Sequence, residues 1–225
     1  MLRIAHRGAS AIAPENTLAA IRRAIELGAR WVEVDVQACA DGLVVIHDDT
    51  LERTTNGHGP LATQTVDALR KLDAGYLQPG HGERIPLPDE VLDLCRGRCA
   101  VNLELKAPNV APRLLPLLAQ TLAGGWPADA LLCSSFDWPQ LAALRAALPG
   151  LSLGVLCEQV DAAAVTMAHA LGARVIACAL QHADADAVAA AHGAGCALWV
   201  FTVNDADCAA RLAALGVDGI FSDHP

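Results

Sequence analysis

Two short segments alternate apolar with charged residues. In WVEVDV, residues 31–36, Glu33 and Asp35 flank one valine, and in VNLELK, residues 101–106, Glu104 and Lys106 flank one leucine. Because successive side chains of a strand point to opposite faces, each segment would place its charged residues on one face. A buried charge without a partner costs several kcal/mol, so charged faces on strands of this kind indicate a functional site.

The three carboxylates form an oxygen-rich set that is typical of a site for Mg²⁺ or Ca²⁺. Glu33, Asp35 and Glu104 are therefore candidate ligands of one divalent cation. The alternative is a buried ion pair of Lys106 with Glu104 or Asp35 that serves only the fold. We favour the metal site for the whole set, because the active sites of barrel enzymes lie at the carboxyl ends of strands.

Two histidines occupy matching positions, His6 at the end of LRIAH and His47 at the end of LVVIH. A single histidine there would more often be a hydrogen-bonded core residue, but a pair beside a cation site predicts a general base and a general acid. We assign His6 as the base and His47 as the acid. Arg7 and Lys106 would add positive charge at the same place and indicate a phosphate ester as substrate.

The composition limits the remaining possibilities. The chain has 225 residues, 53% of them hydrophobic, and its 16 basic against 25 acidic side chains give a net charge of −9. This length fits one larger domain or at most two small ones. The acidic excess argues against nucleic acid or an anionic membrane as a partner, because such binding needs clustered basic residues.

The location we expect is the cytoplasm. The amino end, MLRIAHRGAS, does not resemble a secretory signal, and no apolar stretch approaches the ~18 residues of a membrane span. The eight cysteines form no CxxC pair and mostly lie in apolar runs, so we interpret them as small buried residues in a reducing compartment.

Repeated strand and helix patterns predict how these residues are positioned. Apolar strand-like runs begin near residues 131, 152, 174, 197 and 217, at intervals of 20 to 23 residues, and alanine-rich helical segments follow the first four. Asp137, Asp161 and Asp205 are expected to cap three of these helices. With LRIA at 2–5, WVEVDV and the run near 101, there are eight parallel-type strands, which predicts a single-domain (β/α)8 TIM barrel over residues 1–225.

One further run, LVVIH at 43–47, follows WVEVDV too closely for a helical crossover and should pair with it as an antiparallel hairpin. Residues 49–99 depart from the repeat and are predicted to be a small inserted subregion after the second strand, with short helices near 65–72 and 88–95. No helix is expected between the eighth strand and Pro225, so an eighth helix is either missing or lies in a tail outside this sequence.

Eight motifs then carry a family resemblance: HRG at 6–8, PENT at 14–17, EVDV at 33–36, HDDTLERTTNG at 47–57, LELK at 103–106, SSF at 134–136, FTVN at 201–204 and GVDGIFSDHP at 216–225. In order and spacing, the sequence resembles the glycerophosphodiester phosphodiesterases of the compact bacterial cytosolic type.

The resemblance implies a barrel with a divalent cation on Glu33, Asp35 and Glu104, His6 and His47 as the acid–base pair, and Arg7 and Lys106 as phosphate contacts. It further implies that Glu15 and Asn16 shape the mouth of the site and orient His6 or Lys106. Phe136 and Trp199 match apolar residues near the leaving alcohol. Phe201 departs from the family pattern, which has tryptophan before Thr-Val-Asn.

The predicted activity is hydrolysis of small-molecule glycerophosphodiesters to sn-glycerol 3-phosphate and an alcohol. The sequence leaves open the head group, the native metal, the oligomeric state, and whether water or a glycerol hydroxyl attacks first. A lysophospholipase D-like or phospholipase C-like phosphodiesterase is the main alternative. An amidohydrolase-like barrel is disfavoured because the first strand ends in His-Arg-Gly, not His-x-His. A non-catalytic phosphate-binding protein would not need two histidines.

Overall fold

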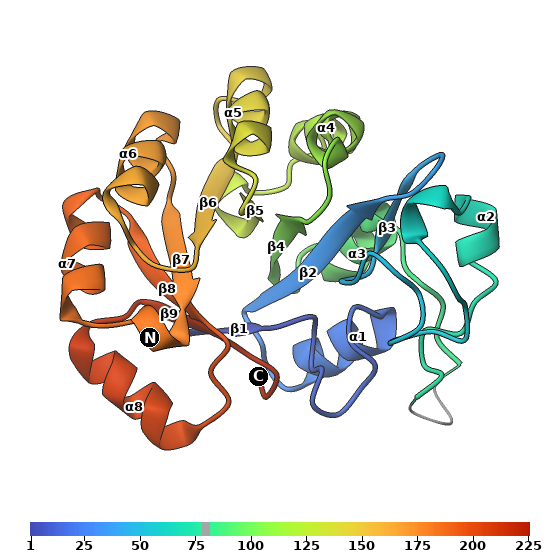
Figure 1. The fold of residues 1–225 in the computed structure, drawn as a ribbon, viewed down its shortest axis with the longest axis horizontal. Coiled ribbons are helices and arrows are strands. Elements are labelled where there is room, and N and C mark those ends of the chain that lie inside the picture. Colours follow the sequence, from blue (N-terminus) through green and yellow to red (C-terminus); the bar gives the residue numbers. More distant parts are fainter. Residues whose placement is uncertain (78–81) are drawn as a thin grey trace.

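The computed structural model describes residues 1–77 and 82–225. Its sheet contains eight parallel strands that close into a barrel, because β1 pairs with both β9 and β2. Their bounds are β1 Leu2–Ala5, β2 Trp31–Ala38, β4 Ala100–Leu105, β5 Leu131–Ser135, β6 Ser152–Cys157, β7 Val175–Ala179, β8 Ala197–Phe201 and β9 Gly219–Ser222. This arrangement (Figure 1) confirms the predicted (β/α)8 barrel.

The helices between the strands surround the barrel (Figure 1). They are α1 Leu18–Glu26, α3 Pro88–Cys95, α4 Val110–Ala123, α5 Trp138–Ala147, α6 Ala162–Leu171, α7 Ala185–Gly193 and α8 Ala206–Leu215. Asp161 and Asp205 cap their helices as predicted, accepting from the backbone N–H groups of Ala164 and Cys208. Asp137 also occupies an N-cap position, but its carboxylate accepts a hydrogen bond from the side chain of Gln140 and not from the helix backbone.

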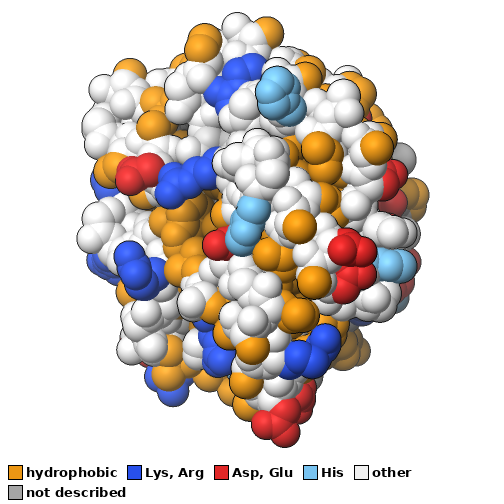
Figure 2. Space-filling view, turned by 90° about the vertical axis from the view of Figure 1, so that its left-hand side faces the viewer, with side chains coloured by type: hydrophobic (Ala, Val, Ile, Leu, Met, Phe, Trp, Pro, Cys, Tyr) orange, Lys and Arg blue, Asp and Glu red, His pale blue; other side chains and the backbone are white. Residues whose placement is uncertain are grey.

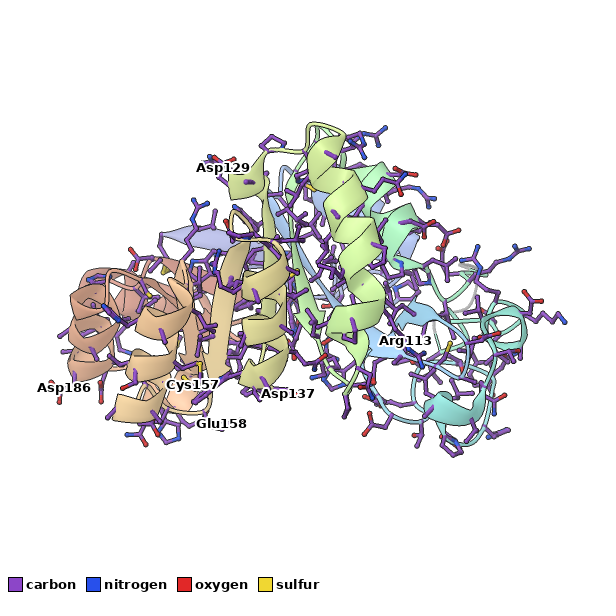
Figure 3. All side chains as sticks on the ribbon, turned by 90° about the horizontal axis from the view of Figure 1, so that it is seen from above. Arg113, Asp129, Asp137, Cys157, Glu158 and Asp186 are labelled. Carbon is purple, nitrogen blue, oxygen red and sulfur yellow. The ribbon has the colours of Figure 1, made fainter. Side chains whose placement is uncertain are left out.

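Strand parity divides the side chains into two layers. Val32, Val34 and Val36 face outward into the main core beneath the helices. Ile4, Leu132, Val175, Trp199 and Phe221 fill the barrel interior. The charged residues of β2 and β4 share the interior side and lie at the carboxyl ends of the strands. Figure 3 shows that Asp137 and Glu158, which follow β5 and β6, lie at one end of the barrel, and Asp129, which precedes β5, lies at the other.

The expected hairpin forms between β2 and β3 (Leu43–Val45), with Ala38 opposite Leu43. Beyond it, η1 (Leu61–Thr63) and α2 (Val66–Leu69) enclose a separate small core that includes Ile46, Leu51 and Ile85. Residues 78–81 of the predicted inserted subregion, 49–99, lie outside the described residues. Helix α3, at the end of the range 49–99, contributes Val91 and Leu92 to the main core and contacts α1. It therefore takes the place of a barrel helix, and the segment inserted after the hairpin ends before it.

Four further features of the described residues concern membrane spans, cysteines, surface charge and the short 3-10 turns. No helix of the described residues is long and apolar enough to cross a membrane. All eight cysteines are free, and six of them are buried. On the face shown in Figure 2, lysine and arginine side chains are dispersed among acidic, apolar and other residues. The remaining short elements are the 3-10 turns η2 (Ala128–Ala130) and η3 (Leu180–His182).

Candidate active site

A tight turn after β1 places His6 and Arg7 at the carboxyl end of the barrel. Arg7 has φ +57°, and Gly8 has φ +81°. A Cβ atom on Gly8 would lie only 2.6 Å from the backbone carbon of Ala20, so this position requires glycine. The turn also aims the backbone N–H of Arg7 at Glu33, whose Oε2 accepts it at 2.9 Å.

Neighbouring strands bring the three predicted acidic residues together. Asp35 of β2 lies opposite Glu104 of β4 in the register. One oxygen from each of Glu33, Asp35 and Glu104 lies within 4.8 Å of the others, and Glu33 and Asp35 are each only 1% exposed. The acidic residues that parity placed on one face of each segment therefore meet in a compact acidic cluster.

The electrostatics of this cluster suit a cation. Burial, followed by the charges of Asp35 and Glu104, raises the pKa of Glu33 well above its ordinary value. Burial and the Asp35 charge likewise raise the pKa of Glu104. Oε1 of Glu33 is buried and has no hydrogen-bond partner among the described residues. Three carboxylates with an unsatisfied buried oxygen fit a hard divalent cation such as Mg²⁺ or Ca²⁺.

Asn16 supports this cluster, which corrects one sequence expectation. Its Nδ2 donates to Oδ2 of Asp35 at 2.7 Å, and its Oδ1 accepts the backbone N–H of Asp35 at 3.0 Å. Asn16 therefore orients Asp35, not His6 or Lys106. Its left-handed conformation, φ +57°, turns the amide inward toward the strand.

His6 is oriented by a carboxylate from the other end of the chain. Its Nδ1 lies 2.7 Å from Oδ1 of Asp223, which also accepts from Ser10, while Asn204 donates to Oδ2. The hydrogen bond from His6, with those from Asn204 and Ser10, holds the pKa of Asp223 well below its ordinary value. Because Asp223 is ionised, Nδ1 of His6 carries the proton and Nε2 is the atom left for chemistry.

His47 is oriented in the same way. Its Nδ1 lies 2.6 Å from Oδ1 of Asp48. Hydrogen bonds from Arg53 and then from His47 lower the pKa of Asp48 to about 2, so Nδ1 of His47 is again the donor. Its Nε2 lies 3.2 Å from Nζ of Lys106.

Arg7 and Lys106, the two predicted phosphate contacts, lie beside carboxylates of the acidic cluster. Lys106 Nζ is 3.0 Å from Glu104 and 3.8 Å from Asp35. Nε of Arg7 is 3.3 Å from Asp35 but makes no hydrogen bond there. Burial alone would lower the pKa of both cations, but the nearby carboxylates outweigh it and raise both values. Both side chains are therefore charged beside the cluster.

The two histidines, the two cations and the acidic cluster line a cavity of about 180 Å³ that has apolar lining residues as well. The polar lining comprises His6, Arg7, Glu33, Asp35, His47, Glu104, Lys106 and Thr202. Phe136, Leu156, Phe201 and Phe221 form the apolar lining, in which the rings of Phe136 and Phe201 meet edge to face at 5.8 Å.

Of the two predicted apolar contacts, only Phe136 lines this cavity, and it is 45% exposed. Trp199 is 5% exposed and packs edge to face on Trp31 and Phe221 inside the barrel. It lies beneath the cavity because it is two residues earlier on β8 than Phe201, which takes the lining position.

Glu15 and Arg53 form a second arrangement beside the cavity. Glu15 accepts from Nη1 of Arg7 at 2.8 Å and from both terminal nitrogens of Arg53, at 2.7 and 2.8 Å. It makes no hydrogen bond or ion pair with His6 or Lys106, contrary to the expectation from the sequence. Burial alone would raise the pKa of Glu15, but the hydrogen bonds from Arg53 and the charge of Arg7 lower it.

Sequence reasoning did not select Asp48, Arg53 or Asp223 as site residues. Asp48 directly follows His47 and Arg53 lies within the same motif, so a carboxylate and a cation next to an assigned histidine were available signals. Asp223 is 217 residues from His6, and only the closed barrel brings the two together.

The fold and the cavity define a (β/α)8 barrel with an acidic, histidine-flanked site at the carboxyl ends of its strands. The model of the glycerophosphoryl diester phosphodiesterase family matches residues 6–225, and the chain belongs to this family.

A glycerophosphodiester phosphodiesterase of Caldanaerobacter subterraneus subsp. tengcongensis is 40% identical over 164 residues, which span 69% of this chain and 66% of that protein. The match thus covers slightly less than two thirds of the relative's length. The solved structure of a phosphodiesterase from Oleispira antarctica, in complex with the product sn-glycerol-3-phosphate, is similar with a TM-score of 0.92 and 33% identity, over 100% of this chain and 94% of that one. A glycerophosphodiester phosphodiesterase from Agrobacterium tumefaciens has a TM-score of 0.85 and 30% identity, over 100% and 97% of the two chains.

Proposed function

We propose that this protein hydrolyses glycerophosphodiesters to sn-glycerol 3-phosphate and a free alcohol. The observation that carries the proposal is the geometry of the two histidines. Each ring has Nδ1 on an ionised carboxylate, and both rings border one cavity together with Arg7, Lys106 and the acidic cluster. Binding alone does not need two groups that can exchange protons, whereas cleavage of a phosphodiester does.

Glu33, Asp35 and Glu104 are the residues that would hold a divalent cation. When bound, a cation of this kind polarises phosphoryl and hydroxyl oxygens and offsets negative charge. The chain supplies the rest of the positive charge. Arg7 can direct its guanidinium toward phosphate oxygens, and Lys106 can exchange its contact with Glu104 for one with the phosphate.

The two histidines divide the proton transfers. Nε2 of His6 accepts the proton of the attacking hydroxyl, and the ionised Asp223 stabilises the imidazolium that results. Nε2 of His47, in its protonated form, donates to the departing alkoxide, and Asp48 keeps the ring in position. The assignment of base and acid to these particular rings is part of the proposal.

The size of the cavity favours small diesters over lysophospholipids. About 180 Å³ suits a glycerophosphoryl group, whereas an acyl chain would have to leave across the exposed ring of Phe136. A lysophospholipase D-like or phospholipase C-like activity is the second candidate, because the apolar lining could meet such a chain. Turnover of lysophosphatidylcholine faster than that of glycerophosphocholine would favour the second candidate.

The experiment is an assay of sn-glycerol 3-phosphate release from glycerophosphocholine, with Mg²⁺ or Ca²⁺ and with a chelator. We expect His6→Ala and His47→Ala each to lower kcat by about 10²–10⁴. The control is His192→Ala, which removes a histidine that pairs with Asp218 on the surface. Full activity of either active-site variant would reject the mechanism.

The proposal includes a small-molecule substrate and a cytoplasmic location. The eight free cysteines support a reducing compartment, because oxidising compartments favour disulfides. Cell fractionation, with detection of the chain in each fraction by an antibody, would test the location.

A further inference from the structure

Arg53 lies outside the cavity but connects, through two carboxylates, to two residues of its polar lining, His47 and Arg7. Its side chain is 46% exposed, and it does not line the cavity that holds the histidines. Nε and Nη2 contact Asp48 at 2.5 and 2.9 Å, while Nη1 and Nη2 contact Glu15 at 2.7 and 2.8 Å. The planar guanidinium thus spans two carboxylates that lie 33 residues apart in sequence.

Each of these carboxylates contacts a different site residue. Asp48 accepts from Nδ1 of His47, and Glu15 accepts from Nη1 of Arg7. The chain of contacts runs from His47 through Asp48, Arg53 and Glu15 to Arg7. It joins the segment after β3 to the loop between β1 and α1.

We infer that Arg53 is a positioning residue that fixes His47 and Arg7 relative to each other through Asp48 and Glu15. The inference rests on the proposed function for its kinetic consequences, but its structural content does not. Without Arg53, Asp48 and Glu15 lose their bridging partner and can turn toward solvent, since both are partly exposed. A shift of about 1 Å in a positioning group can cost about 10²-fold in rate.

Lysine cannot replace arginine here. The guanidinium presents donors on two edges in a fixed plane, and Arg53 uses both edges, one for each carboxylate. An ammonium group is a point donor and would satisfy one carboxylate at a time. The two routes also predict separable effects: loss of the Asp48 contact should lower kcat, and loss of the Glu15 contact should raise KM.

The kinetic test compares Arg53→Ala, Arg53→Lys and Arg70→Ala on glycerophosphocholine. Arg70 is the matched control, because it forms a two-nitrogen pair with Glu90 away from the cavity. We expect both Arg53 variants to lose about 10- to 100-fold in kcat/KM and Arg70→Ala to stay within twofold of the parent.

Two further experiments, double variants and rescue by guanidinium ion, distinguish positioning from a merely structural role of Arg53. In the Asp48→Asn background, Arg53→Ala should lower kcat little further, and in the Glu15→Gln background it should raise KM little further. Guanidinium ion should partly restore Arg53→Ala, because Arg53 borders an open cavity of about 140 Å³ that can admit the ion. Arg53→Ala kinetics within twofold of the parent, or full additivity in both backgrounds, would overturn the inference.

A spectroscopic measurement keeps the test independent of turnover. The Nδ1 proton of His47, assigned by its loss in His47→Gln, gives a downfield proton NMR signal while it is held by Asp48. We expect this signal to broaden in Arg53→Ala and Arg53→Lys and to persist in Arg70→Ala. The Nδ1 proton of His6, on Asp223, is the internal control. If the parent protein turns over no glycerophosphodiester but the signals behave this way, the proposed function fails and the positioning role stands. An unchanged His47 signal in Arg53→Ala rejects the positioning role.

Discussion

Lys106 and His47 are within hydrogen-bonding distance, with Nζ of the lysine 3.2 Å from Nε2 of the histidine. Since Nδ1 of His47 donates to the ionised Asp48, a neutral ring offers Nε2 as an acceptor, and the ammonium group of Lys106 can donate to it. In this arrangement Nε2 carries no proton, so the acid role proposed for His47 requires that Lys106 turn to the phosphate and that Nε2 take up a proton before it donates to the leaving group.

Removal of that ammonium group should impair catalysis strongly. We expect Lys106→Ala to lower kcat/KM for glycerophosphocholine by about 10²-fold or more, because it removes charge stabilisation at the phosphoryl group. Lys71→Ala is the control, since Lys71 is the other lysine of the chain and is exposed. Equal rates for the two variants would contradict a role of Lys106 in phosphate binding.

The orientation of His6 depends on Asp223, and replacing one carboxylate oxygen of Asp223 with an amide nitrogen tests this dependence. Asp223→Asn removes the charge and can present an N–H group to the ring, which would reverse its tautomer. We expect kcat to fall by about 10²-fold or more, with little change in the melting temperature. Asp218→Asn alters a comparable pair with His192 on the surface and should leave kcat as it is. Similar losses in both variants would point to a general effect on folding.

Divalent cations should stabilise the protein through the acidic cluster. At a concentration about 100 times Kd, binding adds about 2.7 kcal/mol, or roughly 5–10 °C in melting temperature for a domain of this size. Glu33→Gln should abolish this increase and should also raise the melting temperature of the metal-free protein, because burial and neighbouring charges already oppose ionisation of Glu33.

Differential scanning calorimetry with and without Mg²⁺ or Ca²⁺ measures both effects. Glu26→Gln on the exposed side of α1 is the control, and it should keep the full response to metal. A metal response that survives in Glu33→Gln would remove Glu33 from the ligand set.

Acid should weaken the Asp48 contacts at a predictable pH. The pKa of Asp48 is about 2 in the folded chain, below its ordinary value of 3.8, so the folded state favours the ionised form. Its contribution to stability is full above about pH 3.8 and disappears as the pH falls toward 2. Urea titrations between pH 2 and 5 should show a shallower loss of unfolding free energy for Asp48→Asn than for the parent. Parallel curves would contradict this linkage.

The turn after β1 gives a test of backbone geometry. Gly8→Ala must place a methyl group 2.6 Å from the backbone of Ala20, whereas Gly28→Ala, at a similar positive φ of +88°, meets no atom within 4 Å. Gly28→Ala should therefore cost only the left-handed strain of about 1–2 kcal/mol. Gly8→Ala should cost more and should also reduce activity, because it displaces Arg7. Chemical denaturation of both variants provides the comparison, and equal losses of stability would contradict the predicted overlap.

The sequence was sufficient for features that depend on local periodicity. Alternation alone placed Glu33 with Asp35 on one face of the first segment and Glu104 with Lys106 on one face of the second, and the parallel register of β2 and β4 brings the two faces together. Depth along a strand is not encoded in alternation, which is why Trp199 was expected at the cavity but lies beneath it, while Phe201 lines it. Loop contacts were also beyond reach, since Asn16 and Glu15 contact Asp35 and Arg53 through turns whose shape depends on tertiary packing.

The pairing of His6 with Asp223 has a consequence for folding intermediates. These residues are 217 positions apart, and β1 must pair with β9 before the ring of His6 contacts the carboxylate of Asp223. A partly assembled barrel with β9 undocked would lack the contact that orients His6, the proposed base, however well its other strands had formed. The ability to transfer protons should thus appear late in refolding, when the barrel closes. Partly folded forms of the chain should be inactive.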